Sequence, residues 1–221
     1  MVGGLDRLRE ELNRMTRPRV ARRCTLLLLA ASIGAGACER GESSPANRTP
    51  ALVGVIDSAL PIDTLLRRFR AAITDTPTVL LGGAATPEAL TQALLTAVGR
   101  RDTSAIRSLV MNRSEFVWLY YPHTKFTRQP YELGPDLVWM QTRLASEQGI
   151  TRLFARYGGS QLRFAGLSCS DSSTREGPNR LVADCRVRFA AADSAERELR
   201  LFGALLNRDG RYKFLTYAND L

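Results

Sequence analysis

The hydrophobic period of this chain changes at Gly158-Gly159. Before this pair, apolar residues recur at spacings of three and four, which is typical of one face of an amphipathic helix. After it the period falls to two, as in a strand with one buried face: Leu181, Ala183, Cys185, Val187 and Phe189 alternate with mostly polar residues. Helices followed by strands predict an α+β fold, with N-terminal helices packed on a curved antiparallel sheet of about four to six strands.

The apolar stripes predict five helices. They start near Leu60, at Pro87 after a Thr86 cap, at Asp102 or Thr103, at Ser114, and at Pro135 after Gly134. The last is the longest, with a weak point at Gly149 and a stop at Gly158-Gly159. Beyond the first strand, residues 199–206 are apolar on both faces, Asp209-Gly210 is a hairpin turn, and residues 211–217 form a closing strand.

A short apolar leader precedes these elements. Residues 25–37 are apolar or small, include four consecutive leucines, follow a patch of arginines and end directly before Cys38. The run is too short for a membrane span, which needs roughly 20 apolar residues, and the layout is that of a secretory signal. It resembles bacterial lipoprotein signals, which implies cleavage before Cys38 and acylation of that cysteine. An unmodified signal cut elsewhere is the alternative.

The leader sets the expected domain organisation and location. Residues 1–37 are predicted to be removed, and Met15 is a better start than Met1 because acidic residues between them are atypical of a basic leader. Residues 38–50 contain almost no apolar side chains and predict a flexible tether. Residues 51–84 follow as a helical extension, and residues 85–221 as the main domain. We expect an exported protein, lipid-anchored to the bacterial envelope on its periplasmic side, at the outer membrane rather than the inner.

Cysteine placement agrees with an oxidising compartment. Cys169 and Cys185 lie symmetrically about Gly177, on either side of a turn-rich stretch between two strand-like runs. If these runs pair as a hairpin, the two cysteines face each other and can form a disulfide. Two buried free thiols are the alternative. No cysteine cluster has metal-ligand spacing and His123 is the sole histidine, so neither a metal nor a cofactor is expected.

The positive charge of the chain is spread out. The formal net charge is +9, and part of it belongs to the leader. The remaining arginines stand singly or in pairs rather than in a stripe, which argues against a nucleic-acid partner. Solvated faces and contact with anionic lipid are the expected uses.

The order of elements resembles the nuclear transport factor 2-like superfamily, which includes SnoaL-like proteins. The resemblance covers roughly residues 85–221 and rests on the Gly-Pro-Asp helix start before the sheet and on the ending Leu-Leu-Asn-Arg-Asp-Gly-Arg-Tyr-Lys-Phe-Leu. It implies a cone-like sheet around an internal pocket. The superfamily holds isomerases, dehydratases, cyclases and proteins that only bind or dimerise, so the fold does not fix the function.

An aromatic segment, residues 118–125 followed by Tyr131 and Trp139, is the candidate for chemistry. Pockets favour aromatic walls with a few polar groups, and a histidine titrates near neutral pH. Candidate acids or bases are His123, Tyr120 and Tyr121, and candidate ligand contacts are Trp118, Tyr131, Trp139 and Arg143. The alternative is that His123 is scaffolding and the aromatic residues are core.

These features favour a binding or interaction module over an enzyme. A small hydrophobic ligand and a second copy of the chain are the expected partners besides the membrane. Two alternatives stay open: a small-molecule isomerase or hydrolase that uses an interior pocket, and a structural dimer built on the sheet face that bears Phe202 and Ala204.

Overall fold

The computed structural model describes residues 60–191 and 195–221, all within the unit Val55–Leu221. The predictions for residues 1–37, for acylation at Cys38 and for the tether lie outside these residues. The helical elements are α2 (Ile62–Ala71), α3 (Pro87–Arg100), α4 (Thr103–Leu109), α5 (Arg113–Glu115), η1 (Phe116–Tyr120), η2 (Tyr121–His123), η3 (Lys125–Thr127) and α6 (Pro135–Tyr157). The strands are β1 (Leu162–Ser168), β2 (Ser173–Glu176), β3 (Asn179–Ala183), β4 (Arg186–Ala191), β5 (Arg197–Leu199), β6 (Ala204–Arg208) and β7 (Arg211–Phe214).

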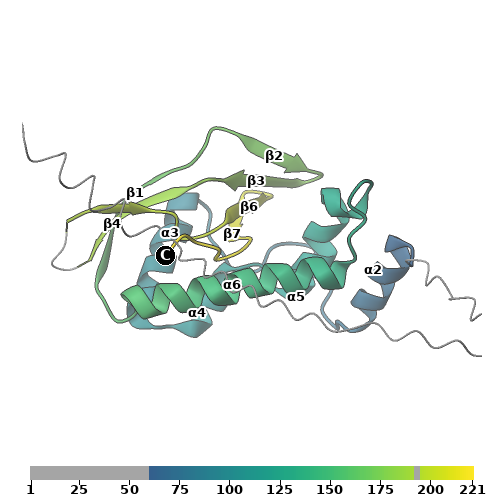
Figure 1. The fold of residues 1–221 in the computed structure, drawn as a ribbon, viewed down its shortest axis with the longest axis horizontal. Helices are drawn as coiled ribbons and strands as arrows, with labels where there is room; N and C mark the ends of the chain where they lie inside the picture. The colour runs from purple at the N-terminus through teal and green to yellow at the C-terminus, as the bar shows by residue number, and fades with distance from the viewer. Residues whose placement is uncertain (1–59, 192–194) are drawn as a thin grey trace, which may run out of the picture. The chain divides into compact units, whose positions relative to one another are not determined.

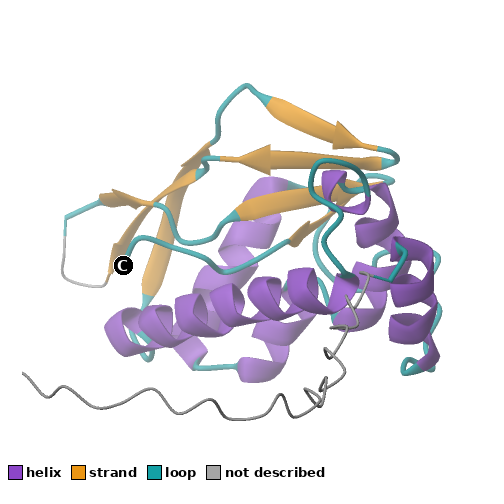
Figure 2. Cartoon of the chain, turned by 45° about the vertical axis from the view of Figure 1, so that its right-hand side comes forward, coloured by secondary structure: helices purple, strands orange, loops and turns teal. Residues whose placement is uncertain are grey.

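The strands form two open antiparallel sheets, with the orders β1-β4-β5 and β2-β3-β6-β7. The chain passes from one sheet to the other three times, between β1 and β2, between β3 and β4, and between β5 and β6. The two sheets are therefore the two halves of one sharply bent antiparallel meander (Figure 1). The helices lie on one side of it (Figure 2). The α+β class and the antiparallel pairing are as the sequence predicts.

A disulfide joins the meander at its bend. Cys169 directly follows β1, Cys185 directly precedes β4, and their sulfurs lie 2.11 Å apart. The register that pairs Ser168 with Arg186 places these two cysteines opposite each other. This confirms the predicted pairing. Cys185 is fully buried, so the bridge also belongs to the core.

The strands are shorter than the sequence predicts. The run 181–189 breaks between β3 and β4, where Asp184 takes a positive φ of 52°. The run 199–206 breaks between β5 and β6, because Leu201 and Phe202 are consecutive and both fully buried, whereas a regular strand turns one of two neighbours outward. The predicted turn between the cysteines contains β2 and narrows to Gly177-Pro178. Periodicity alone does not detect these bends.

Helix starts follow the expected capping residues. Thr86 Oγ1 accepts the backbone N–H of Ala89 at 3.1 Å, and Asp102 Oδ1 accepts that of Ala105 at 2.9 Å. The helix expected at Ser114 is only the three-residue α5, which continues as a π-helical turn over Phe116–Tyr120. Such turns reorient side chains within a helical segment.

Helix α6 runs unbroken through Gly149, the predicted weak point. A Cβ at this position would lie 1.7 Å from the carbonyl oxygen of Tyr217. Gly149 is therefore the place where the C-terminal segment crosses against α6. Asn219 secures this crossing, because its Nδ2 donates to the carbonyl of Gly149 at 2.9 Å.

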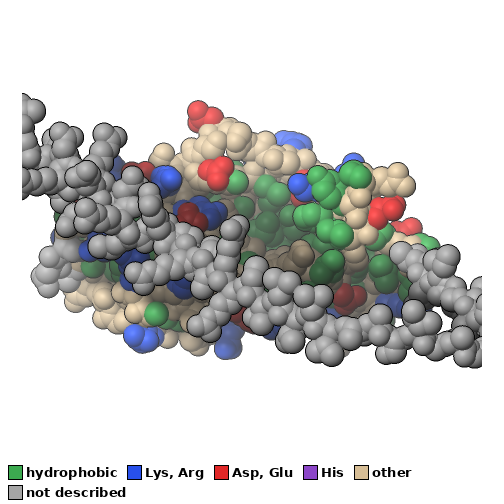
Figure 3. Space-filling model, in the orientation of Figure 1, with side chains coloured by type: hydrophobic (Ala, Val, Ile, Leu, Met, Phe, Trp, Pro, Cys, Tyr) green, Lys and Arg blue, Asp and Glu red, His purple; other side chains and the backbone are tan. Residues whose placement is uncertain are grey.

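Two apolar clusters fill the space under the bent sheet. The larger joins α3, α4 and α6 to both sheets and contains Leu94, Phe189 and Phe214; the smaller gathers around Phe116 and Tyr121. Helix α3 packs on β1, whereas α2 packs on α6 and η1. On the face that Figure 3 shows, hydrophobic side chains gather between the sheet and α6, and Lys and Arg side chains stand at scattered points.

Candidate ligand-binding groove

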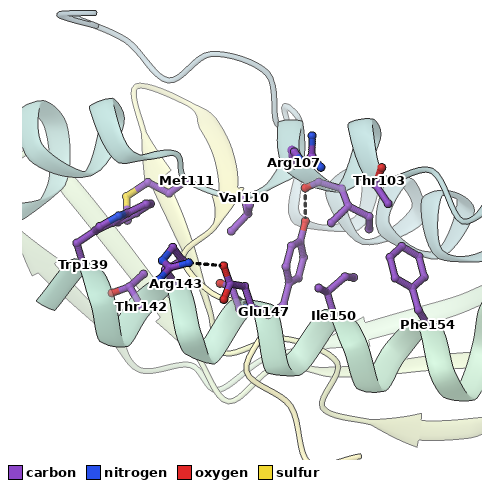
Figure 4. Close-up of a pocket in the computed structure, with 13 residues that line it drawn as sticks. Thr103, Arg107, Val110, Met111, Trp139, Thr142, Arg143, Glu147, Ile150 and Phe154 are labelled. Carbon is purple, nitrogen blue, oxygen red and sulfur yellow. Dashed lines mark hydrogen bonds and ion pairs between the residues drawn. The ribbon is translucent and has the colours of Figure 1, made fainter. Parts of the chain in front are cut away.

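A groove of about 380 Å³ lies between α4 and α6. Side chains of α6 rise toward Val110, Met111 and α4 across it (Figure 4). Its lining is mainly apolar and aromatic, with a polar rim: Thr103, Ile106, Arg107, Val110, Met111, Trp139, Thr142, Arg143, Ser146, Glu147, Ile150, Phe154 and Tyr217. A concave, mainly apolar site of this size that carries a few polar groups is typical of small-molecule binding.

Tyr217 forms part of the lining and ties the two walls together. Its hydroxyl donates to the carbonyl of Ile106 in α4 at 2.7 Å, and its backbone N–H donates to Ser146 Oγ in α6 at 3.2 Å. Burial raises the pKa of Tyr217 far above its usual value, so the phenol stays neutral. These two bonds fix the position of α4 relative to α6 beside the groove.

The rim carries two cations and one anion. Arg143 Nη1 and Glu147 Oε1 lie 2.7 Å apart one turn apart on α6, and both side chains are about half exposed, at 52% and 54%. Arg107 on α4 is exposed and has no hydrogen-bond or ion-pair partner within residues 60–191 and 195–221. Of the two guanidinium groups at the rim, that of Arg143 is paired with Glu147 and that of Arg107 is unpaired within the described ranges.

The structure divides the predicted ligand contacts among three places. Trp139 and Arg143 line the groove. Tyr131 lies in a separate hollow, and Trp118 lies under the guanidinium of Arg70, 4.0 Å from the ring centroid. Residues close together in the aromatic segment lie in different places because the segment folds into a π-helical turn and two 3₁₀ turns.

The two candidate tyrosines are part of the core. Tyr120 and Tyr121 are 5% and 0% exposed, and the hydroxyl of Tyr121 donates to the carbonyl of Leu133 at 2.7 Å. Burial, and then the charge of Asp136, raise the pKa of Tyr121 to about 12. Burial, and then Glu176, raise the pKa of Tyr120 still further. Both phenols are protonated near neutral pH and neither reaches the groove, so this geometry offers no support for either tyrosine as a base.

His123 packs on the turn between β2 and β3. A Cβ at Gly177, whose φ is +59°, would lie 2.7 Å from the imidazole Nδ1. Burial lowers the pKa of His123, and the nearby Arg208 guanidinium lowers it further, so the ring is neutral near pH 7. With Tyr131 and Glu176 it lines a hollow of about 310 Å³. No nucleophile is bonded to the ring in the described part of the chain, which leaves the enzyme alternative without a supporting contact.

A fully buried ion pair joins Glu115 to Lys213. The Nζ of Lys213 lies 2.7 Å from Glu115 Oε2 and also donates to the carbonyl of Leu81 at 2.8 Å. The carboxylate accepts the backbone N–H groups of Leu81 and Asn112 at 2.7 and 3.0 Å. Burial lowers the pKa of Lys213, against the opposing effect of Glu115. Because every polar atom here has a partner, the pair fastens α5 and the Leu81 segment to β7. No local pattern in the sequence predicts this pair, and only the Asn112–Glu115 capping-box spacing signals the carboxylate.

Comparison with known proteins identifies no relative: no protein-family model, no curated protein and no solved structure matches the chain. Within the described ranges, no helix has the length and apolar content to cross a bilayer. The same residues contain no group of three or more His, Cys, Asp or Glu side chains that could hold a metal ion.

Proposed function

We propose that this protein is a lipid-anchored binding module of the bacterial cell envelope that takes a small apolar molecule into the groove between α4 and α6. The groove supports the proposal: it has a volume of about 380 Å³, a mainly apolar lining and a polar rim, and Tyr217 bonds to both of its walls. Val110, Trp139, Ile150 and Phe154 in the lining are half-buried, and covering their remaining apolar surface with a ligand is favourable.

The location in the envelope rests on the leader and on Cys38. The disulfide between Cys169 and Cys185 supports it, because such bonds persist in oxidising compartments and are rare in the cytosol. Helices on one side of a bent antiparallel meander support a nuclear transport factor 2-like cone as the finer description of the fold. The space beneath the sheet is filled by the chain's own side chains, which favours the groove over a cone interior as the binding place.

Of the two residues that define the expected dimer face, Ala204 is half-buried and Phe202 is not accessible. Phe202 is fully buried and packs against Phe214, with ring centroids 4.5 Å apart and ring planes tilted by 46°. A second copy cannot contact this side chain without unfolding the domain.

Occupancy of the groove can be measured with a neutral apolar dye, N-phenyl-1-naphthylamine. Trp118→Phe leaves Trp139, in the groove, as the single indole of the chain. We expect energy transfer from Trp139 to the bound dye. Thr142→Phe fills the groove and should abolish the transfer. Thr151→Phe is the matched control, since both threonines lie on α6 with their hydroxyls bonded to the carbonyl four residues earlier, and Thr151 is outside the groove.

Both variants keep all residues outside the described part, so dye bound there contributes equally and the difference reports the groove. Equal transfer in Thr142→Phe and Thr151→Phe would refute the proposed site.

The anchor is tested by Cys38→Ala. We expect this variant to lose palmitate labelling and to leave the membrane fraction of cells. Continued labelling of the variant would end the lipoprotein proposal, without bearing on the groove.

A further inference from the structure

We infer that the ligand of the groove is an amphiphile with an apolar body and an anionic head group, and that Arg107 binds the head. This inference rests on the proposed function and specifies its ligand. It starts from the charge balance of the rim, where Arg107 and Arg143 stand against Glu147 alone.

Arg107 is the charged side chain of the groove lining that has no hydrogen-bond or ion-pair partner within residues 60–191 and 195–221. The neighbouring acid on the same segment, Asp102, is used as the cap of α4 through the N–H of Ala105. Arg107 can therefore bind a ligand without breaking a bond to any residue of the described ranges. A guanidinium presents paired N–H donors that match a carboxylate or a phosphate, with stronger hydrogen bonds than a neutral group makes.

Arg143 can assist because its present partner is weakly held. Its bond to Glu147 joins two half-exposed side chains, and such pairs contribute little to stability. Glu147 can swing away when an anion arrives, although its charge still opposes the anion. A cationic head would instead meet two guanidinium groups. The net positive charge of the rim therefore favours an anionic head, and the negative charge of Glu147 lowers the affinity for it.

The body of the ligand is apolar because the lining behind the rim is apolar. Ile106, Val110, Ile150 and Phe154 form this surface, and Trp139 lies within it. None of them carries a charge, and the indole N–H of Trp139 is their one polar side-chain group, so this surface offers no ion pair to a second head. One charged end and one hydrocarbon body are the chemistry that the groove accommodates.

The test displaces the neutral dye from Trp118→Phe protein with four ligands of equal chain length: decanoate, decyl phosphate, decanol and decyltrimethylammonium, each below its micelle concentration. We expect decanoate or decyl phosphate to bind about tenfold more tightly than decanol, as one charge-assisted hydrogen-bonded contact provides, and the cation to bind worst. The stronger of the two anions identifies the head as carboxylate or phosphate.

Variants assign the head contact. Arg107→Gln should remove most of the preference for the anion and leave decanol binding unchanged, whereas Glu147→Gln should tighten anion binding. Arg163→Gln is the control, since Arg163 is an exposed arginine on β1 that is not in the groove lining. If decanol binds as tightly as both anions, or if Arg107→Gln and Glu147→Gln leave the preference unchanged, the inference is overturned while the apolar groove stands. If no ligand displaces the dye, the proposed function itself fails.

Discussion

Two of the ion pairs in this domain, Glu115–Lys213 and Arg143–Glu147, differ in burial and in hydrogen bonding. At the Glu115–Lys213 pair both side chains are at most 1% exposed, and backbone groups satisfy the remaining bonding positions. At the groove the Arg143–Glu147 pair is half exposed and Arg107 has no partner in the described part of the chain. The first arrangement has no capacity left for a ligand and serves the fold. In the second arrangement, an exposed guanidinium lies beside apolar side chains that are only half-buried, and a ligand can contact both.

The largest expected effect is on the buried pair. Lys213→Met leaves the Glu115 carboxylate buried without its cation, and we expect a loss of about 3–5 kcal/mol in the free energy of unfolding. Urea denaturation measures it. The exposed Lys125→Met should change stability by no more than about 0.5 kcal/mol. Dye binding by the folded fraction of Lys213→Met should stay normal, because Lys213 does not line the groove. A small loss of stability in Lys213→Met would erase the distinction between the two regions.

The disulfide gives the next largest effect and lies outside the groove lining. Replacing both cysteines, Cys169→Ala with Cys185→Ala, should cost about 3 kcal/mol, since the bridge closes a separation of 16 residues in the unfolded chain. Dye binding should persist under conditions where the variant is folded. Loss of binding in a folded variant would show that the groove depends on the bend of the sheet.

His123 predicts a smaller effect that depends on pH. Its folded pKa lies below the ordinary 6.5, so between these two values the unfolded chain binds more protons. Stability therefore rises with pH through this window and is lost as the pH falls below about 6.5. We expect the free energy of unfolding, measured with urea, to fall more between pH 8 and pH 5.5 for the wild type than for His123→Asn. Identical pH dependence in the two proteins would contradict the packing of the imidazole on Gly177.

The smallest effect on stability is expected at the groove rim. Arg143→Ala removes an exposed pair one turn apart on α6 and should cost about 0.2–0.5 kcal/mol. The same change should weaken the binding of decanoate or decyl phosphate, because Arg143 lies at the rim and assists the binding of the anionic head. A stability loss above about 1 kcal/mol would place this pair with Glu115–Lys213 as a structural element and weaken the contrast.

Local signals in the sequence predict much of the fold. Gly134-Pro135 and Gly158-Gly159 bound α6 as the sequence predicts, and the symmetry of Cys169 and Cys185 predicts their bridge. The sheet bends escape prediction because they depend on which of two apolar neighbours the core accepts, as at Leu201 and Phe202. A pattern with a period of two contains no information about that choice.

The groove was predicted only in part. Trp139 and Arg143 were candidates, but Arg107 was not, because it lies on α4, far from them in the sequence, and no local pattern links the two helices. The density of aromatic residues also made Tyr120 and Tyr121 candidates, but both side chains pack in the core. Dense aromatic sequence marks buried surface as readily as a pocket.

A second apolar surface on α6 allows the most direct test of the binding site. Leu137, Met140 and Leu144 are 40%, 45% and 41% exposed, and none of them lines the groove. A photoreactive diazirine analogue of decanoate, crosslinked to the full chain and mapped by tandem mass spectrometry, distinguishes the two surfaces. The account predicts adducts on groove residues of α4 and α6, such as Ile106, Ile150 and Phe154, and their loss in Thr142→Phe. Adducts confined to Leu137, Met140 and Leu144, unchanged in that variant, would contradict it.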